Sequence, residues 1–300
     1  MVSSSSPSQS PTRDREACSR NDDFDPNRYV ESSGLRIALA SGLKIVACFV
    51  VMAITTAIWT GVMLLLLPWP YERIKQGNLY GHITGRILLW ILGNPIKITG
   101  AEHANAKAIY ICNHASPLDI FLVMWLTPLG TVGIAKKEII WYPLFGQLYV
   151  LANHLRIDRS NPNAAIRSIN EVRINRFGDD SITIPRNLFS QVAKSVTKKD
   201  LSLIIFPEGT RSASGRLLPF KKGVVHIALQ TKRPIVPIVI TGTHRAWHKD
   251  SLKIRPAPLT VKFLPPIETQ EWLPEKADSY LEMLRCLYVD NLPECQRPLN

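Results

Sequence analysis

Residues 108–119 read Ala-Ile-Tyr-Ile-Cys-Asn-His-Ala-Ser-Pro-Leu-Asp, a short apolar run that ends in a polar turn. The apolar part, residues 108–112, predicts a buried β-strand. The residues after the turn are again apolar and favour a helix over residues 117–127. His114 and Asp119 therefore fall between a strand and a helix, at the kind of strand end where the sites of α/β sheets usually form.

The same alternation continues along the chain. Further strands are expected at 131–135, 201–206, 235–240 and 259–263, and further helices at 161–173, 220–230 and 277–289. This pattern predicts an α/β domain over residues 94–300, with a mixed sheet flanked by helices.

The composition and the absence of several motifs exclude some classes of function. The net charge of +12 favours anionic partners, but zinc-finger spacing and RNA-binding aromatic motifs are absent, so we expect no nucleic-acid partner. The five cysteines are scattered and odd in number, which favours a reducing environment. The glycine motifs of serine hydrolases, dinucleotide-binding folds and P-loops do not occur. His244 and His248 lack a third ligand, so we expect no metal and no cofactor.

The N-terminal third predicts attachment to a membrane. Residues 1–34 are rich in Ser, Pro, Asp and Arg, and we interpret them as a disordered tail. Residues 45–67 carry no charge and would form a helix about 35 Å long, enough to cross a bilayer core. A buried core helix or a helix lying in the membrane plane is the alternative. A second apolar segment over 78–92 predicts a helical hairpin across residues 35–93.

Glycines in that second segment recur every four residues, at Gly77, Gly81 and Gly85, which would let a neighbouring helix approach closely.

Residues 173–192 do not fit the alternation. They contain the helix breakers Gly178 and Pro185, and joining Val172 directly to Ala193 restores one apolar helix face. We interpret the twenty residues as an insertion into a helix.

The pair His114 and Asp119 suits acyl transfer. A neutral imidazole can take the proton of an attacking hydroxyl near pH 7. A carboxylate that accepts a hydrogen bond from the other ring nitrogen fixes the tautomer and stabilises the imidazolium. Because the substrate hydroxyl can itself be the nucleophile, a catalytic serine is unnecessary.

A second polar segment also follows an apolar strand, and it contains Glu208, Gly209, Thr210 and Arg211. Gly209 lets backbone N–H groups approach a ligand, Thr210 offers a hydroxyl and Arg211 can bind a phosphate in a bidentate manner. Glu208 is expected to position Arg211 or a glycerol hydroxyl. Two further cations, Lys137 and Arg159, are candidate phosphate ligands, with a solvated basic edge near anionic lipid as the alternative.

Together these segments resemble the glycerolipid acyltransferase family. Its four sequence blocks appear in order over 113–119, 156–159, 206–212 and 235–243, and the details around them are similar to the plant seed (microsomal) group. Arg156 stands where many members carry Phe.

The resemblance implies acyl-CoA as donor, lysophosphatidate as acceptor and phosphatidate as product. It makes His114 the general base at the sn-2 hydroxyl and Asp119 its orienter. Glu208, Gly209 and Arg211 would bind the acceptor's glycerol phosphate, with Lys137 and Arg159 as lesser candidates. A membrane enzyme of the endoplasmic reticulum whose catalytic domain faces the cytosol is implied. Glycerol 3-phosphate or another lysophospholipid as acceptor, or hydrolysis of a thioester by His114, remain alternatives.

Overall fold

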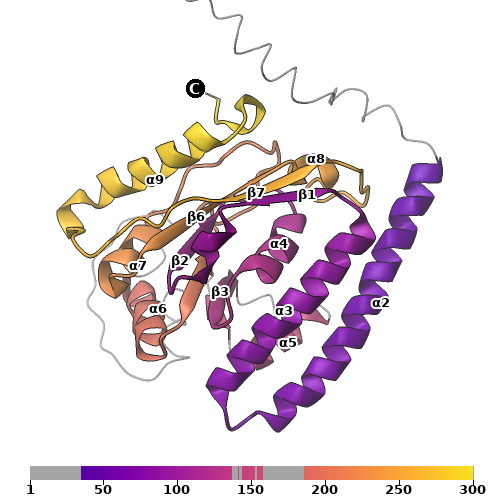
Figure 1. The fold of residues 1–300 in the computed structure, drawn as a ribbon, viewed down its shortest axis with the longest axis horizontal. Helices are drawn as coiled ribbons and strands as arrows, with labels where there is room; N and C mark the ends of the chain where they lie inside the picture. Colours follow the sequence, from indigo (N-terminus) through magenta and orange to yellow (C-terminus); the bar gives the residue numbers. More distant parts are fainter. Residues whose placement is uncertain (1–34, 137–140, 142–143, 153, 158–185, 300) are drawn as a thin grey trace, which may run out of the picture.

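The computed structural model describes residues 35–136, 141, 144–152, 154–157 and 186–299. Within these residues, seven strands form one sheet in the order β1-β7-β6-β2-β5-β3-β4 (Figure 1). The strands are β1 Ile96–Thr99, β2 Ile109–Cys112, β3 Thr131–Lys136, β4 Leu155–Ile157, β5 Ser202–Ile205, β6 Ile235–Thr241 and β7 Leu259–Phe263. The five strands from β6 to β4 run parallel, whereas β7 is antiparallel to β6, so the sheet is mixed.

The five strands predicted from sequence are confirmed within one or two residues at each end. Strands β1 and β4 were not predicted. Both are short, and each contains one charged residue, Lys97 or Arg156, which breaks the apolar run that identifies a buried strand.

Helices cover both faces of the sheet. The long ones after the hairpin are α4 Leu118–Leu126, α6 Arg186–Lys198, α7 Gly223–Thr231 and α9 Ala277–Asn291; short ones are α5 Phe145–Leu151, α8 Thr243–Ala246, and the 3-10 helices η1 Ala101–Asn105, η3 Pro274–Lys276 and η4 Glu294–Gln296. Helices α4, α7 and α9 were predicted and are confirmed. The helix predicted at 161–173 lies outside the described residues.

The predicted insertion is described only in its last part. Residues 173–185 lie outside the described residues, and residues 186–192 form the first turns of α6. Val192 and Val196 are both buried in the core, so this end of the segment is part of a packed helix.

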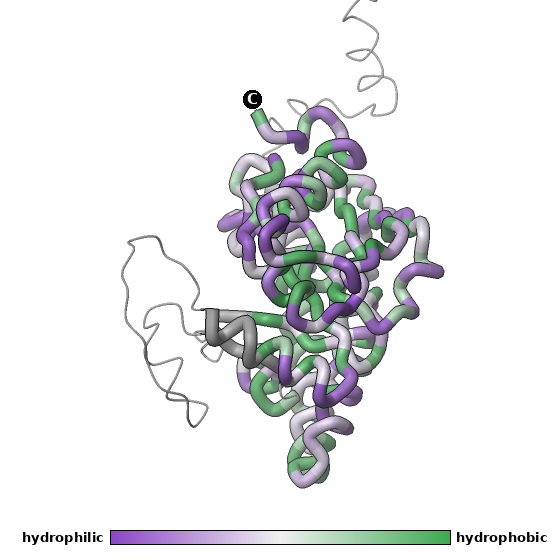
Figure 2. Tube along the Cα trace, turned by 90° about the vertical axis from the view of Figure 1, so that its left-hand side faces the viewer, coloured by the Kyte–Doolittle hydropathy of each residue, from purple (hydrophilic) through white to green (hydrophobic). Residues whose placement is uncertain are grey.

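The core has two layers because side chains of each strand alternate between the faces. On one face Ile109 and Ile111 of β2 pack with α6, α7 and α9. On the other face Tyr110 and Cys112 pack with α4 and the hairpin. A side view shows hydrophobic residues in the interior and hydrophilic ones at the outer turns (Figure 2).

The N-terminal hairpin consists of α2 Leu35–Leu65 and α3 Pro70–Leu92. The glycine pattern of α3 does allow close packing, but toward the α/β domain. A Cβ on Gly85 would lie 2.8 Å from the carbonyl oxygen of Phe121 in α4, and one on Gly77 would lie 2.6 Å from Cβ of Ala152 after α5. Helix α3 therefore fixes the hairpin to the domain.

One helix of the described residues is long and apolar enough to cross a membrane, over Ala38–Leu65 of α2. It has a buried stripe that includes Ser41 and Met63, and a broad exposed apolar face. That face contains Leu39, Leu43, Val46, Phe49, Val50, Ile54, Ile58, Leu64 and Leu65, each more than half exposed. Such a continuous apolar surface is characteristic of contact with lipid or another protein, and it suggests membrane association.

Candidate active site

Parallel pairing of β2 with β5 places the two predicted polar segments side by side. Ile111 of β2 stands opposite Ile205 of β5, and the chain leaves both strands at the same edge of the sheet. The segment that carries His114 follows β2 within two residues, and Glu208 follows β5 within three. The sheet thus brings together residues that lie far apart in the sequence.

Asn113 extends this edge toward β6. Its side-chain amide donates to the carbonyl oxygen of Ile240 and its Oδ1 accepts from the Ile240 N–H, both at 2.8 Å. The side chain is buried. It therefore fixes the backbone immediately before His114.

His114 and Asp119 form a hydrogen-bonded pair, with Nδ1 of His114 3.0 Å from Oδ2 of Asp119. Because a carboxylate only accepts hydrogen bonds, Nδ1 carries the proton and Nε2 is the basic nitrogen. The imidazole also stacks on Phe206, with ring centroids 4.1 Å apart. The ring is thus held on two sides.

Asp119 is buried in the first turn of α4, and its charge is stabilised by backbone groups. The same Oδ2 accepts hydrogen bonds from the N–H groups of Ala115 and Ser116, both at 2.7 Å. The positive end of the helix dipole favours the negative charge there. Oδ1 is buried and has no hydrogen-bond partner among the described residues.

Glu208 points back toward His114. Its Oε1 accepts from the backbone N–H of His114 at 2.7 Å, and its Oε2 accepts from the N–H of Leu218 at 2.8 Å. Burial raises the pKa of Glu208 to about 7; the two N–H groups oppose that shift and the nearby Asp119 adds to it. In this arrangement both oxygens hold the protein backbone, whereas the sequence predicted a partner in Arg211 or in the acceptor's glycerol.

The turn after Glu208 is shaped by Gly209, which has a φ of +73°. A Cβ added there would lie 3.1 Å from Cε of Lys221. Thr210 is exposed, and Arg211 is partly exposed with its Nη2 3.7 Å from the exposed carboxylate of Asp250. An ion pair this exposed is weak, so an anionic ligand can compete for Arg211.

Lys221 was not found from the sequence. It lies twelve residues after Gly209 and carries no motif of its own; only the fold places its side chain over the turn. Lys137 and Arg159, the other two predicted cations, lie outside the described residues.

The described part of the chain contains no cluster of three His, Cys, Asp or Glu side chains suited to a metal ion. His244 is buried, and burial, more than the nearby Arg245, lowers its pKa to about 4. His248 is exposed.

Comparison with known proteins identifies the family. The Acyltransferase family model matches residues 95–241. A 1-acyl-sn-glycerol-3-phosphate acyltransferase from Cocos nucifera is 62% identical over 275 residues, which cover 92% of this chain and 83% of that protein. The chain belongs to the 1-acyl-sn-glycerol-3-phosphate acyltransferase family. It is therefore an acyltransferase, as the sequence motifs predicted.

Distant members share its core. The enzyme of the same name from Escherichia coli is 31% identical over 225 residues, covering 74% of this chain and 81% of that protein. The crystal structure of the 1-acyl-sn-glycerophosphate acyltransferase PlsC from Thermotoga maritima superposes with a TM-score of 0.63 at 20% identity, covering 83% of this chain and 94% of that one. The predicted fold class is confirmed.

The raised pKa of Glu208 predicts a pH-dependent stability. Between about pH 4.5 and 7 the folded state binds more protons than the unfolded state, so the free energy of unfolding falls as pH rises. Glu208→Gln cannot titrate. The stability of the wild type relative to this variant should therefore decrease by up to about 3 kcal/mol between about pH 5 and 8. Urea unfolding of both proteins at the two pH values measures the difference between their free energies of unfolding. A difference that does not change with pH contradicts the prediction.

Proposed function

We propose that this enzyme transfers an acyl chain from acyl-CoA to the sn-2 hydroxyl of 1-acyl-sn-glycerol 3-phosphate and releases phosphatidate and coenzyme A. The name shared by its relatives supports the acceptor. The observation that carries the mechanism is the contact between His114 Nδ1 and Asp119 Oδ2, which leaves Nε2 as a base.

The reaction follows from this tautomer. Nε2 of His114 takes the proton of the sn-2 hydroxyl as its oxygen attacks the thioester carbonyl carbon. The tetrahedral intermediate then collapses, the carbon–sulfur bond breaks, and the imidazolium returns its proton to the leaving thiolate. Asp119 stabilises the positive charge that His114 carries between these two steps.

Binding of the acceptor is proposed at the turn beside His114. Arg211 and Lys221 flank Gly209 and Thr210, so a phosphate there would meet two cations and the backbone of a glycine turn. Glu208 contributes by holding His114 and Leu218 in place. Lys137 and Arg159 remain predicted phosphate ligands. No metal or other cofactor is required by this mechanism, in which acyl-CoA is a co-substrate.

His114→Ala should lower phosphatidate formation by about two to four orders of magnitude, the contribution expected of a general base. Membrane association should stay unchanged. His103→Ala, on η1, is the matched control and should retain full activity. Formation of radiolabelled phosphatidate from lysophosphatidate and acyl-CoA measures this; normal turnover of His114→Ala would rule out the mechanism.

The Asp119→Asn variant removes the negative charge beside His114 but keeps the hydrogen bonds that orient the imidazole. The Asn oxygen can still accept from His114, Ala115 and Ser116, while its NH₂ group occupies the position of Oδ1, which has no partner among the described residues. The tautomer is then kept and only the negative charge is lost, so activity should fall less than in His114→Ala.

Arg211→Ala should raise the apparent KM for lysophosphatidate at least about tenfold and leave the KM for acyl-CoA unchanged, because a charge-assisted contact to phosphate contributes about 1.5–3 kcal/mol. Arg285→Ala, on α9, is the control. A selective loss of acyl-CoA affinity would instead assign Arg211 to the donor.

An acceptor panel decides the substrate. Lysophosphatidate, glycerol 3-phosphate and other lysophospholipids are offered with acyl-CoA, and free fatty acid is measured without acceptor. We expect lysophosphatidate to be converted to phosphatidate. Rapid release of free fatty acid both with and without lysophosphatidate would support a thioester hydrolase.

Attachment to the membrane is proposed through the exposed apolar face of α2. Ser41, near the start of this helix, accepts from the N–H of Ile254 and donates to its carbonyl oxygen. Met63, near the end, is buried beside Leu148 and Ala152. Because α2 contacts the catalytic domain at both ends, we propose that it lies along the domain in the membrane surface, on the cytosolic side of the endoplasmic reticulum.

Protease digestion of sealed microsomes tests this topology. With an epitope placed before residue 35, both the epitope and the catalytic domain should be digested from the cytosolic side. Protection of the epitope alone would show that α2 crosses the bilayer.

A further inference from the structure

The C-terminal 3-10 helix η4 contacts the loop 215–218, which follows the Glu208 turn. Gln296, the last residue of η4, is 1% exposed. Its carbonyl oxygen accepts from the N–H of Leu217 at 2.8 Å, and its side-chain amide donates to the carbonyl oxygen of Gly215 at 3.4 Å. Its Oε1 accepts from the N–H of Gly242 at 3.3 Å. One side chain thus joins that loop to the end of β6.

The loop held by Gln296 leads directly to the catalytic histidine. Leu218, next to Leu217, donates its N–H to Glu208, and the other oxygen of Glu208 accepts the N–H of His114. The chain between Glu208 and this loop makes a further contact, in which the N–H of Ser212 donates to the carbonyl oxygen of His114 at 2.8 Å. Glu208 and Ser212 therefore contact both backbone polar groups of His114, and the loop reaches His114 through Glu208.

Space around the loop is closed on the other side. A Cβ on Gly215 would lie only 2.4 Å from Cδ2 of the buried His244, so the loop has no room to move in that direction. Gly215 also has a φ of +77°, which disfavours other residues. The loop is enclosed between His244 and Gln296.

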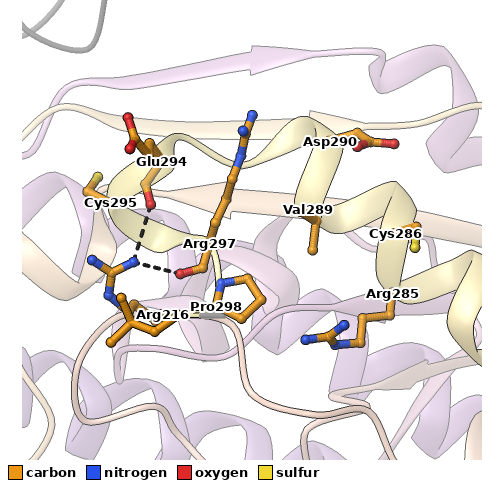
Figure 3. A pocket seen from close by; sticks show the side chains of 10 residues that line it. Arg216, Arg285, Cys286, Val289, Asp290, Glu294, Cys295, Arg297 and Pro298 are labelled. Carbon is orange, nitrogen blue, oxygen red and sulfur yellow. Dashed lines mark hydrogen bonds between the residues drawn. The ribbon is translucent and has the colours of Figure 1, made fainter. Parts of the chain in front are cut away.

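The partly exposed side chain of Arg216 makes a second connection between the same segments. Nη1 of Arg216 donates to the carbonyl oxygens of Glu294 and Arg297, at 3.3 and 2.8 Å, while the carboxylate of Glu294 points away from it (Figure 3). The acceptors are backbone groups, so the side chain of Glu294 is not needed for the contact.

We propose that Gln296 is a positioning residue for acyl transfer, which holds the loop 215–218 so that Leu218 and Glu208 fix the backbone of His114. The proposal rests on the function proposed for His114. Gln296 is uncharged and buried beneath the loop, so it acts through these contacts and not by touching substrate.

Gln296→Leu tests the proposal, because the leucine side chain has a similar volume but cannot make the contacts to Gly215 and Gly242. The backbone bond from the Leu217 N–H to residue 296 is kept, so the variant tests the side chain alone. A shift of His114 by a fraction of an ångström should lower kcat by between about tenfold and a hundredfold. Glu294→Gln is the matched control, since it leaves the backbone carbonyl that Arg216 contacts. Both are assayed as full-length protein in detergent–lipid micelles with lysophosphatidate and acyl-CoA.

The pH profile separates positioning from a loss of stability. The Leu218 N–H lowers the pKa of Glu208, whereas burial and the charge of Asp119 raise it; Cys112 and Tyr288, on the neighbouring β2 and α9, are buried and uncharged. Loosening the loop removes the N–H contribution. Ionised Glu208 accepts both of the N–H groups that fix His114, so the fall of kcat/KM toward acid pH includes the protonation of Glu208. This acid limb should move to higher pH in Gln296→Leu, whereas a smaller folded fraction lowers activity without moving it.

Arg216→Met keeps the test decisive if Gln296→Leu does not fold. Arg216 is only partly buried, so its replacement should fold while loosening the same loop, with a smaller fall in kcat and a limb shift in the same direction. The proposal is overturned if folded Gln296→Leu has the kcat and the pH profile of the wild type. If Gln296→Leu does not fold, the same result in Arg216→Met overturns it. If the wild type makes no phosphatidate, the proposed function fails separately, and the variants are then compared on the acceptor that the panel identifies.

Discussion

β2 and β5 pair in parallel at the centre of the sheet, and this pairing places His114 and Glu208 at one edge. Parallel strands end on the same side, so the polar turns that follow them must meet. Glu208 uses this proximity to bind the backbone of His114, and Asn113 connects the same point to β6. The geometry around His114 depends on three strands that are separated by long stretches of sequence.

Two buried carboxylates stand close to one histidine, and the protein stabilises them differently. Asp119 lies at the start of α4 and accepts two backbone N–H groups and the imidazole on one oxygen. Glu208 accepts one N–H on each oxygen, and burial raises its pKa to about 7. A buried negative charge is costly without such donors. The arrangement assigns Asp119 to the imidazole and Glu208 to the scaffold beneath it.

The hairpin connects the exposed apolar face of α2 to this site. Gly81 and Gly85 of α3 allow close contact with Met124 and Phe121 of α4, the helix that carries Asp119. Helix α2 in turn packs on α3, where Thr56 and the hydroxyl of Tyr80 form a hydrogen bond of 3.1 Å. An apolar face on α2 in contact with lipid would therefore orient α4, the helix that carries Asp119.

The sequence alone determined the strands with continuous apolar runs, the apolar first helix of the hairpin and the pairing of His114 with Asp119. These features are local: a buried strand needs apolar residues, and a carboxylate five positions after a histidine can reach it across one turn. The short strands β1 and β4, the position of Lys221 over Gly209 and the contact of Gln296 with Gly215 were decided only by the tertiary structure. The hydrogen-bond partners of Glu208 were decided there too, because they are backbone N–H groups, which every residue except proline carries and which no sequence pattern marks.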